Sequence, residues 1–221
     1  MGKMARAAEP LYESWRDSIL TFAREGMNFH FTDQQQSLFD LVEMESTMPI
    51  HERKKRIAVR SGQGPGKTAA SVIVALWRCL QYEDALVIVT SPSMRQCKQW
   101  VDECNRLTKT AHPIIRKMVK CFGTKVEING SKMWGIRTAT ATRPENLQGI
   151  HEKHLTFIAD EASGVSAAII ETIPTKNVPV ISQGEIVSQL LFFCRKVRVS
   201  ISIVRCALVA MLFKSVLKLS N

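Results

Sequence analysis

The chain has 221 residues, of which 45% are hydrophobic and 23% are charged, and its formal net charge is +10 at pH 7. No hydrophobic run reaches the roughly 20 residues that a membrane-spanning helix needs. The first ten residues lack the apolar segment of a secretory signal. These features argue against a membrane-bound or exported protein, while the excess of basic residues favours a polyanionic partner such as nucleic acid.

Cysteine usage predicts a reducing compartment, the cytosol. The six cysteines form no Cys-x-x-Cys pair and lie in or near apolar segments, which is typical of buried thiols. His151 and His154 lie three residues apart, but the sequence places no cysteine or carboxylate partner for a zinc site, so we interpret them as structural residues.

The first 50 residues predict a helical lead-in. Apolar residues recur near helical spacing within residues 11–27 and again within residues 33–45. The first set is Leu11, Trp15, Ile19, Leu20 and Phe22, and the second is Leu38, Leu41 and Val42. Both stripes are interpreted as the core-facing sides of helices.

A glycine-rich segment then joins a predicted strand at 57–60 to a predicted helix at 67–81. Residues 61–68 read Ser-Gly-Gln-Gly-Pro-Gly-Lys-Thr. A glycine loop between a strand and a helix is a cradle for phosphate, because glycine permits positive φ and the helix N-terminus adds its dipole. The segment therefore predicts a nucleotide-binding loop.

The motif G-x-x-x-x-G-K-[ST] assigns a role to the last two residues of this segment. Lys67 is expected to reach the β- and γ-phosphates, and the Thr68 hydroxyl is expected to hold Mg²⁺. The match is imperfect, because Ser61 stands at the first glycine position and Pro65 removes one backbone N–H. A plain glycine-rich turn before Lys-Thr is the alternative interpretation.

Further strands and helices alternate along the chain. We predict a strand at 85–90, a helix at 93–108 and a strand at 155–159. Between them, residues 125–140 alternate polar and apolar side chains across an Asn-Gly pair, which predicts an antiparallel hairpin at the sheet edge. Alternating strands and helices predict βαβ units in a mainly parallel sheet.

Two carboxylates follow the strand predicted at 155–159. Asp160 and Glu161 would stand at the carboxyl end of a parallel strand, which is the end where ligands bind in open α/β sheets. In a nucleotide hydrolase, Asp160 would bind Mg²⁺ and Glu161 would orient or deprotonate the attacking water. A solvated Asp-Glu pair at a strand end is the alternative.

These motifs together resemble the ATPase domain of terminase large subunits from tailed bacteriophages, the motors that package DNA into capsids. The resemblance covers residues 12–184 and includes three segments, at 31–39, 58–68 and 158–165. It implies an α/β fold of the P-loop NTPase type, doubly wound, with a mainly parallel sheet. In that family the first glycine of the phosphate loop is often replaced, as Ser61 replaces it here.

The resemblance also implies the members of a nucleotide site. Glu161, Lys67 and Arg60 would be catalytic, with Arg60 stabilising the charge on the γ-phosphate. Relatives often place that arginine inside the loop, where this chain has Gln63, and a solvated cap is the alternative role for Arg60. ATP would contact Gln35, which lies in the segment 31–39 that resembles the family's adenine-recognition segment, and eight loop residues: Ser61, Gly62, Gln63, Gly64, Pro65, Gly66, Lys67 and Thr68. Thr68 and Asp160 would hold Mg²⁺.

Past residue 184 the family pattern stops. Only two of the 20 acidic residues, Glu171 and Glu185, follow Ala162, so no carboxylate cluster is present to form the nuclease domain of a full-length large terminase. We therefore divide the chain into a lead-in at 1–50, an ATPase core at 51–184 and a basic, apolar tail at 185–221. The tail suggests a truncated or frameshifted gene, with residues that are out of frame or disordered.

The function expected from the resemblance is ATP hydrolysis coupled to translocation of double-stranded DNA in the bacterial host cytoplasm. Its partners would be DNA, the portal protein, the small terminase subunit and further copies of the chain, with no membrane. Two alternatives stay open: a helicase-like, DNA-stimulated P-loop ATPase, and an inactive prophage remnant that binds nucleotide without turnover.

Overall fold

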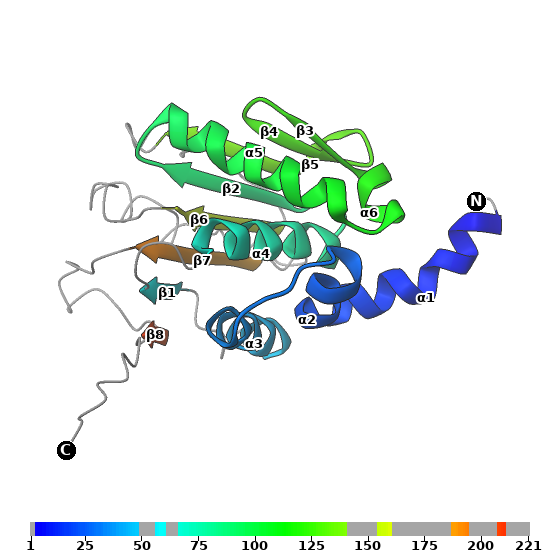
Figure 1. Ribbon diagram of the computed structural model, residues 1–221, viewed down its shortest axis with the longest axis horizontal. Helices are drawn as coiled ribbons and strands as arrows, with labels where there is room; N and C mark the ends of the chain where they lie inside the picture. The colour runs from blue at the N-terminus through cyan, green and yellow to red at the C-terminus, as the bar shows by residue number, and fades with distance from the viewer. Residues whose placement is uncertain are drawn as a thin grey trace, which may run out of the picture.

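The computed structural model shows an α/β protein built on one mixed sheet (Figure 1). It describes residues 3–48, 56–60, 66–140, 154–160, 187–194 and 207–210. Within these ranges the sheet has eight strands in the order β3-β4-β5-β2-β6-β7-β1-β8. Six neighbouring strands, β5-β2-β6-β7-β1-β8, pair in parallel. At the other edge, β4 pairs antiparallel with both β3 and β5. The expected mainly parallel sheet is confirmed.

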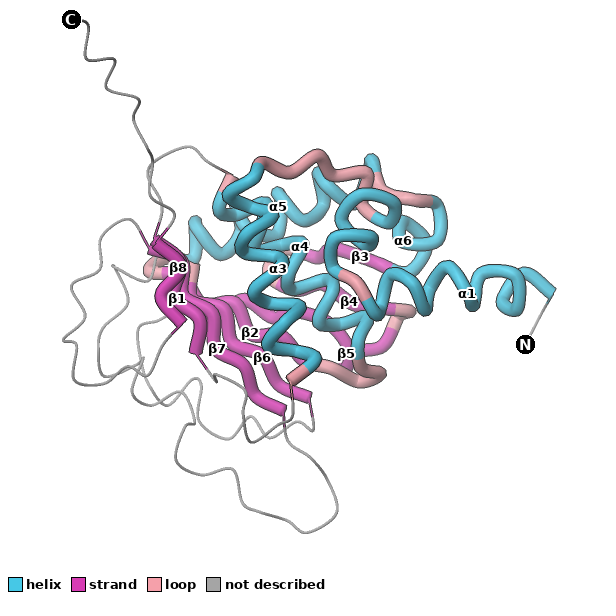
Figure 2. Tube along the Cα trace, turned by 90° about the horizontal axis from the view of Figure 1, so that it is seen from below, coloured by secondary structure: helices cyan, strands magenta, loops and turns pink. Residues whose placement is uncertain are grey.

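The N-terminal lead-in is helical, as predicted. It contains α1 (Lys3–Asp17), α2 (Ile19–Thr21), a π-helical turn η1 (Phe22–Gly26) and α3 (Asp33–Thr47). The predicted stripe turns inward, because Trp15, Ile19 and Phe22 are fully buried. The first part of α1 extends away from the rest of the molecule (Figures 1 and 2).

The central unit follows the predicted order closely. Strand β1 (Arg56–Arg60) precedes α4 (Lys67–Gln81), and β2 (Leu86–Ser91) precedes α5 (Met94–Thr110). From β1 to β2 to β5 the chain advances in one direction across the sheet. Right-handed crossovers therefore place α4 and α5 on the same face, where α3 also lies (Figure 2). The described helices do not form a second layer on the opposite face, so the doubly wound arrangement stays a prediction.

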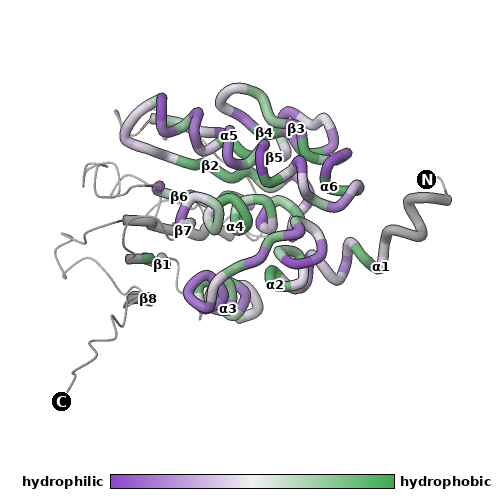
Figure 3. Tube along the Cα trace, viewed as in Figure 1, coloured by the Kyte–Doolittle hydropathy of each residue, from purple (hydrophilic) through white to green (hydrophobic). Residues whose placement is uncertain are grey.

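Helix α4 is the buried centre of this layer. Its residues from Ala69 to Leu80 are all buried, and Figure 3 shows it as mostly hydrophobic, whereas α5 contains more hydrophilic residues. Three buried indole N–H groups hold it in place. Trp77 donates to the carbonyl oxygen of Trp15 at 3.0 Å, Trp134 donates to that of Cys79 at 2.7 Å, and Trp100 donates to the Ser71 hydroxyl at 2.8 Å. Buried tryptophans combine a large apolar surface with a donor that needs a partner, so they fix both the position and the rotation of the helix.

The predicted hairpin forms the antiparallel edge of the sheet. Helix α6 (Pro113–Met118) leads into β3 (Val119–Phe122), β4 (Lys125–Ile128) and β5 (Ser131–Thr140). Asn129 and Gly130 connect β4 to β5 with φ of 51° and 72°, the two positive values of a type I′ turn. Strand β3 extends the hairpin by one strand that the sequence pattern did not predict.

Three strands complete the parallel part: β6 (His154–Ala159), β7 (Val187–Cys194) and β8 (Ala207–Ala210). Strand β7 lies between β6 and β1, and β8 pairs with the other side of β1. The boundary at residue 184 stays a prediction, but β7 and β8, the strands described beyond it, join the sheet.

None of the helices in the described ranges combines the length and apolar character needed to cross a bilayer.

Candidate functional site

The start of α4 carries the described part of the glycine loop. Gly66 is the N-cap residue, with φ of 67° and ψ of 32°, and its carbonyl oxygen accepts the first helical hydrogen bond from the Ala70 N–H at 2.9 Å. The expected positive φ is confirmed at this glycine, whereas residues 61–65 lie outside the described ranges. Lys67 and Thr68 follow in the first helical turn, half-buried, at the positive end of the helix dipole.

Asp160 stands at the carboxyl end of β6, where the sequence places it. It is 7% exposed, and its backbone N–H donates to the Thr90 carbonyl oxygen on neighbouring β2 at 2.9 Å. This bond continues the ladder between β2 and β6 by one residue past Ala159, the last residue of β6. Glu161, the next residue, lies outside the described ranges, so its catalytic role stays a prediction.

The strand order brings the two motifs to one edge of the sheet. Ala159 of β6 is level with Phe192 of β7, and Arg60 of β1 is level with Cys194. Because β1, β6 and β7 are parallel, their carboxyl ends meet at the same edge, the edge at which α4 begins. With β7 between them, the ends of β1 and β6 are two interstrand spacings apart, about 10 Å. This span suits a polyphosphate chain with its cation.

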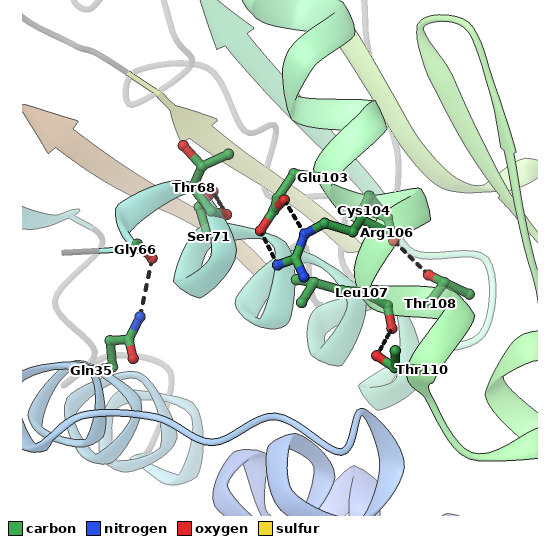
Figure 4. A network of polar contacts seen from close by, with 10 residues as sticks. All are labelled: Gln35, Gly66, Thr68, Ser71, Glu103, Cys104, Arg106, Leu107, Thr108 and Thr110. Atoms are coloured by element: carbon green, nitrogen blue, oxygen red, sulfur yellow. Dashed lines mark hydrogen bonds and ion pairs between the residues drawn. The ribbon is translucent and has the colours of Figure 1, made fainter. Parts of the chain in front are cut away.

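The side chain of Gln35 reaches the start of α4 from α3, a segment that is distant in the sequence. It lies in the first turn of α3, is 6% exposed, and its side-chain Nε2 donates to the Gly66 carbonyl oxygen at 3.1 Å (Figure 4). The structure therefore brings together four of the predicted site residues: Gln35, Gly66, Lys67 and Thr68. Arg60 ends β1 as expected, but its side chain is not among those described, so its assignment stays a prediction.

Two hydrogen bonds of Ser71 support the first turn of α4, and the sequence analysis did not predict them. The Ser71 hydroxyl donates to the Thr68 carbonyl oxygen at 2.8 Å (Figure 4), and the same hydroxyl accepts the indole N–H of Trp100 on α5. Ser71 and Trp100 are fully buried. The support ties the first turn of α4 to α5. No local pattern marks Ser71, because its role depends on a partner 29 residues away.

Comparison with known proteins agrees with this geometry. No protein-family model matches the chain. A probable terminase large subunit of Enterobacteria phage P7 is 28% identical over 120 residues, which cover 49% of this chain and 24% of that protein. The chain thus spans about a quarter of the length of this curated relative.

Solved structures with the same fold include two large terminases. The large terminase of bacteriophage HK97 has a TM-score of 0.54 and 13% identity, over 75% of this chain and 33% of that one. A variant of the large terminase ATPase domain of Thermus phage P74-26 has a TM-score of 0.51 and 17% identity, over 82% of this chain and 71% of that one. The chain therefore has the fold of phage large terminase ATPase domains, and its sequence is similar to that of a phage terminase large subunit.

Proposed function

We propose that this chain binds and hydrolyses ATP and is the ATPase part of a phage DNA-packaging terminase. One observation carries the proposal: the N-terminus of α4 and Asp160 lie at the same edge of the parallel sheet. The residues at that N-terminus are Gly66, Lys67 and Thr68. A large terminase of the same fold from a thermophilic bacteriophage, with a TM-score of 0.51, was solved with ADP bound. That finding concerns the relative, and it supports nucleotide as the ligand here.

The described residues fit a nucleotide with magnesium. Thr68 offers a hydroxyl and Asp160 a carboxylate, both hard oxygen donors of the kind that Mg²⁺ prefers. Bound with ATP, Mg²⁺ would neutralise charge on the β- and γ-phosphates. Lys67 would add a positive charge to the same phosphates, and the backbone N–H groups that open α4 would point toward them.

Hydrolysis is assigned to residues around this binding edge. Glu161 follows Asp160 directly and would orient or deprotonate the attacking water. Arg60, at the end of β1, would stabilise charge that develops on the γ-phosphate. The loop residues Ser61, Gly62, Gln63, Gly64 and Pro65 would surround the phosphates with backbone groups.

DNA is the proposed polymer, and the antiparallel edge offers a surface for it. Register places Phe122, Lys125 and Arg137 side by side across β3, β4 and β5, all three exposed. Like charges directly opposite one another destabilise a sheet. Lys125 and Arg137 are such a pair. Glu127, 2.8 Å from Lys125 Nζ, offsets part of the repulsion, and a polyanion lying across the two basic residues would add further counter-charge. Lys125 also sits over the Phe122 ring, 5.4 Å from its centroid.

The remaining partners follow from the proposed role. A packaging motor would work with the portal protein, the small terminase subunit and further copies of the chain in the host cytoplasm.

An ATPase assay of the purified chain tests the proposal. We expect Mg²⁺-dependent phosphate release that double-stranded DNA stimulates and that Lys67→Ala abolishes. Nucleotide binding without turnover in either condition would instead indicate an inactive remnant. Absence of nucleotide binding would overturn the proposal altogether.

A further inference from the structure

Two cysteines from different elements meet where α5 packs against β3 at the antiparallel edge of the sheet. The sulfur atoms of Cys104 on α5 and Cys121 on β3 lie 3.8 Å apart and are joined by a thiol–thiol hydrogen bond. Both cysteines are free, and they are 17 positions apart in the sequence. Because the sulfur atoms of a disulfide are about 2 Å apart, a small movement of the two side chains would bring these atoms to bonding distance.

The two thiols differ in their surroundings. Cys104 is fully buried in the core, whereas Cys121 is partly exposed. The hydrogen bond with Cys121, together with burial, raises the pKa of the Cys104 thiol well above its usual value. The hydrogen bond with Cys104 lowers the pKa of the Cys121 thiol. Cys121 is therefore the thiol that a reagent in solution can reach and that ionises more readily, and Cys104 is the neighbour that lies behind it.

We propose that Cys104 and Cys121 are a modification site, a dithiol that a peroxide oxidises to an intramolecular disulfide between α5 and β3. In the first step the Cys121 thiolate attacks one oxygen of hydrogen peroxide, the O–O bond breaks, and Cys121 becomes a sulfenic acid. The released hydroxide takes up the proton that Cys121 lost, which gives the first water.

The second step uses the buried thiol. The Cys104 sulfur attacks the Cys121 sulfur, the S–S bond forms and the S–O bond breaks. The leaving hydroxide takes the proton of the Cys104 thiol and departs as a second water. Two thiols are thus oxidised to one disulfide, and one peroxide is reduced to two waters.

The crosslink would hold α5 at two places. Trp100, one helical turn before Cys104, already donates to the Ser71 hydroxyl of α4, and the disulfide would add a covalent link to β3. A disulfide across 17 positions also restricts the unfolded chain. The melting temperature should therefore rise by about 5–10 °C on oxidation. This inference does not depend on the binding of nucleotide.

Peptide mapping of the full chain tests whether the bond forms. The reduced, folded protein is treated with hydrogen peroxide at low protein concentration, capped with iodoacetamide and digested without reductant. Trypsin cleaves after Arg106 and Lys120, so the disulfide would join two separate peptides. We expect Cys104 to Cys121 to be the main linkage, within single molecules, and dithiothreitol to remove it. Oxidation that leaves these cysteines unlinked, or that links Cys121 mainly to another cysteine or another molecule, would overturn the inference.

Variants separate the roles of the two thiols. In Cys104→Ala the sulfenic acid of Cys121 should accumulate and be trapped by dimedone, because the thiol that would consume it is missing. Cys121→Ala changes a partly exposed position and should leave Cys104 unoxidised, so it provides a second test if the Cys104 variant folds poorly. Cys97→Ala is the matched control, because it removes another buried cysteine of α5 and should still form the crosslink. Equal dimedone labelling of Cys121 in the wild type and in Cys104→Ala would contradict the second step.

Thermal melting shows whether the bond fits the native structure. The oxidised wild type and oxidised Cys97→Ala should both melt about 5–10 °C above their reduced forms, whereas the variants that lack Cys104 or Cys121 should show no rise. A crosslinked wild type that melts at or below the temperature of the reduced protein would overturn the inference, because the bond would then form only in a distorted structure.

Discussion

The indole N–H of Trp100 on α5 donates a 2.8 Å hydrogen bond to the hydroxyl of Ser71 on α4, in a fully buried setting. Since Ser71 also donates to the Thr68 carbonyl oxygen, one hydroxyl connects the second helix of the layer to the turn that carries the proposed site. The arrangement makes stability and site geometry depend on the same residue.

Ser71→Ala is expected to destabilise the protein by about 1–3 kcal/mol, because the Trp100 N–H would be left buried without an acceptor. For a chain of this size the melting temperature should fall by about 2–4 °C per kcal/mol. Thermal and urea unfolding provide the measurement. Ser37→Ala, at an exposed serine of α3, is the control and should change stability by less than about 0.5 kcal/mol. In combination with Trp100→Phe, the losses should be less than additive; strict additivity would contradict the coupling.

Lys67→Ala should weaken ATP binding more than tenfold, equivalent to over about 1.4 kcal/mol, because the variant lacks the ammonium assigned to the phosphates. Titration with a fluorescent ATP analogue measures the change. Lys132→Ala, which removes an exposed lysine on the hairpin, is the matched control and should bind like the wild type. Equal affinities in the Lys67 variant and the wild type would remove the phosphate-loop assignment.

Glu161→Gln is expected to keep ATP bound while lowering turnover by orders of magnitude, since the proposed role of this carboxylate lies with the attacking water and not with the nucleotide. Binding is measured by titration and turnover by phosphate release. A parallel fall in affinity and rate would show instead that Glu161 contributes to the binding of the nucleotide.

Lys125→Ala and Arg137→Ala should each weaken binding of double-stranded DNA at every sequence and reduce the slope of log affinity against log salt by about one. Binding is followed by fluorescence anisotropy at several salt concentrations, with Lys109→Ala on the exposed side of α5 as the charge-matched control. If the control variant and these variants lose affinity equally, the antiparallel edge has no specific part in DNA binding.

Thiol reactivity should follow the surroundings of each described cysteine. The hydrogen bond with Cys104, whose sulfur lies 3.8 Å away, lowers the pKa of the Cys121 thiol, whereas burial raises the pKa of Cys79 to about 12. Cys121 is also partly exposed, while Cys79 is fully buried. Iodoacetamide near neutral pH should therefore alkylate Cys121 before Cys79 and leave Cys79 unmodified until the protein unfolds. Peptide mass spectrometry over time checks the order, and comparable rates at the two sites would show that Cys79 is accessible in the native state.

Elements with local signals could be predicted from the residues alone. The apolar run that follows Lys67 predicts a buried helix, and α4 spans the predicted residues. Asn129 and Gly130 predict the type I′ turn because few other residue pairs adopt positive φ at both positions. The segment that ends at Asp160 predicts a strand because a short apolar run bounded by polar residues fits a buried parallel strand.

The way in which these elements pack together is visible only in the folded protein. The insertion of β7 between β6 and β1, which sets the spacing between Asp160 and the start of α4, follows from strand order, and no local pattern encodes that order. The contact between Gln35 and Gly66 joins residues 31 positions apart, and it assigns to the glutamine a partner that the sequence motif did not predict. Ser71 and Trp100 likewise meet only because α4 and α5 pack on the same face of the sheet. Hydrogen bonds between distant segments depend on the packing of whole elements, and short-range propensity therefore leaves them undetermined.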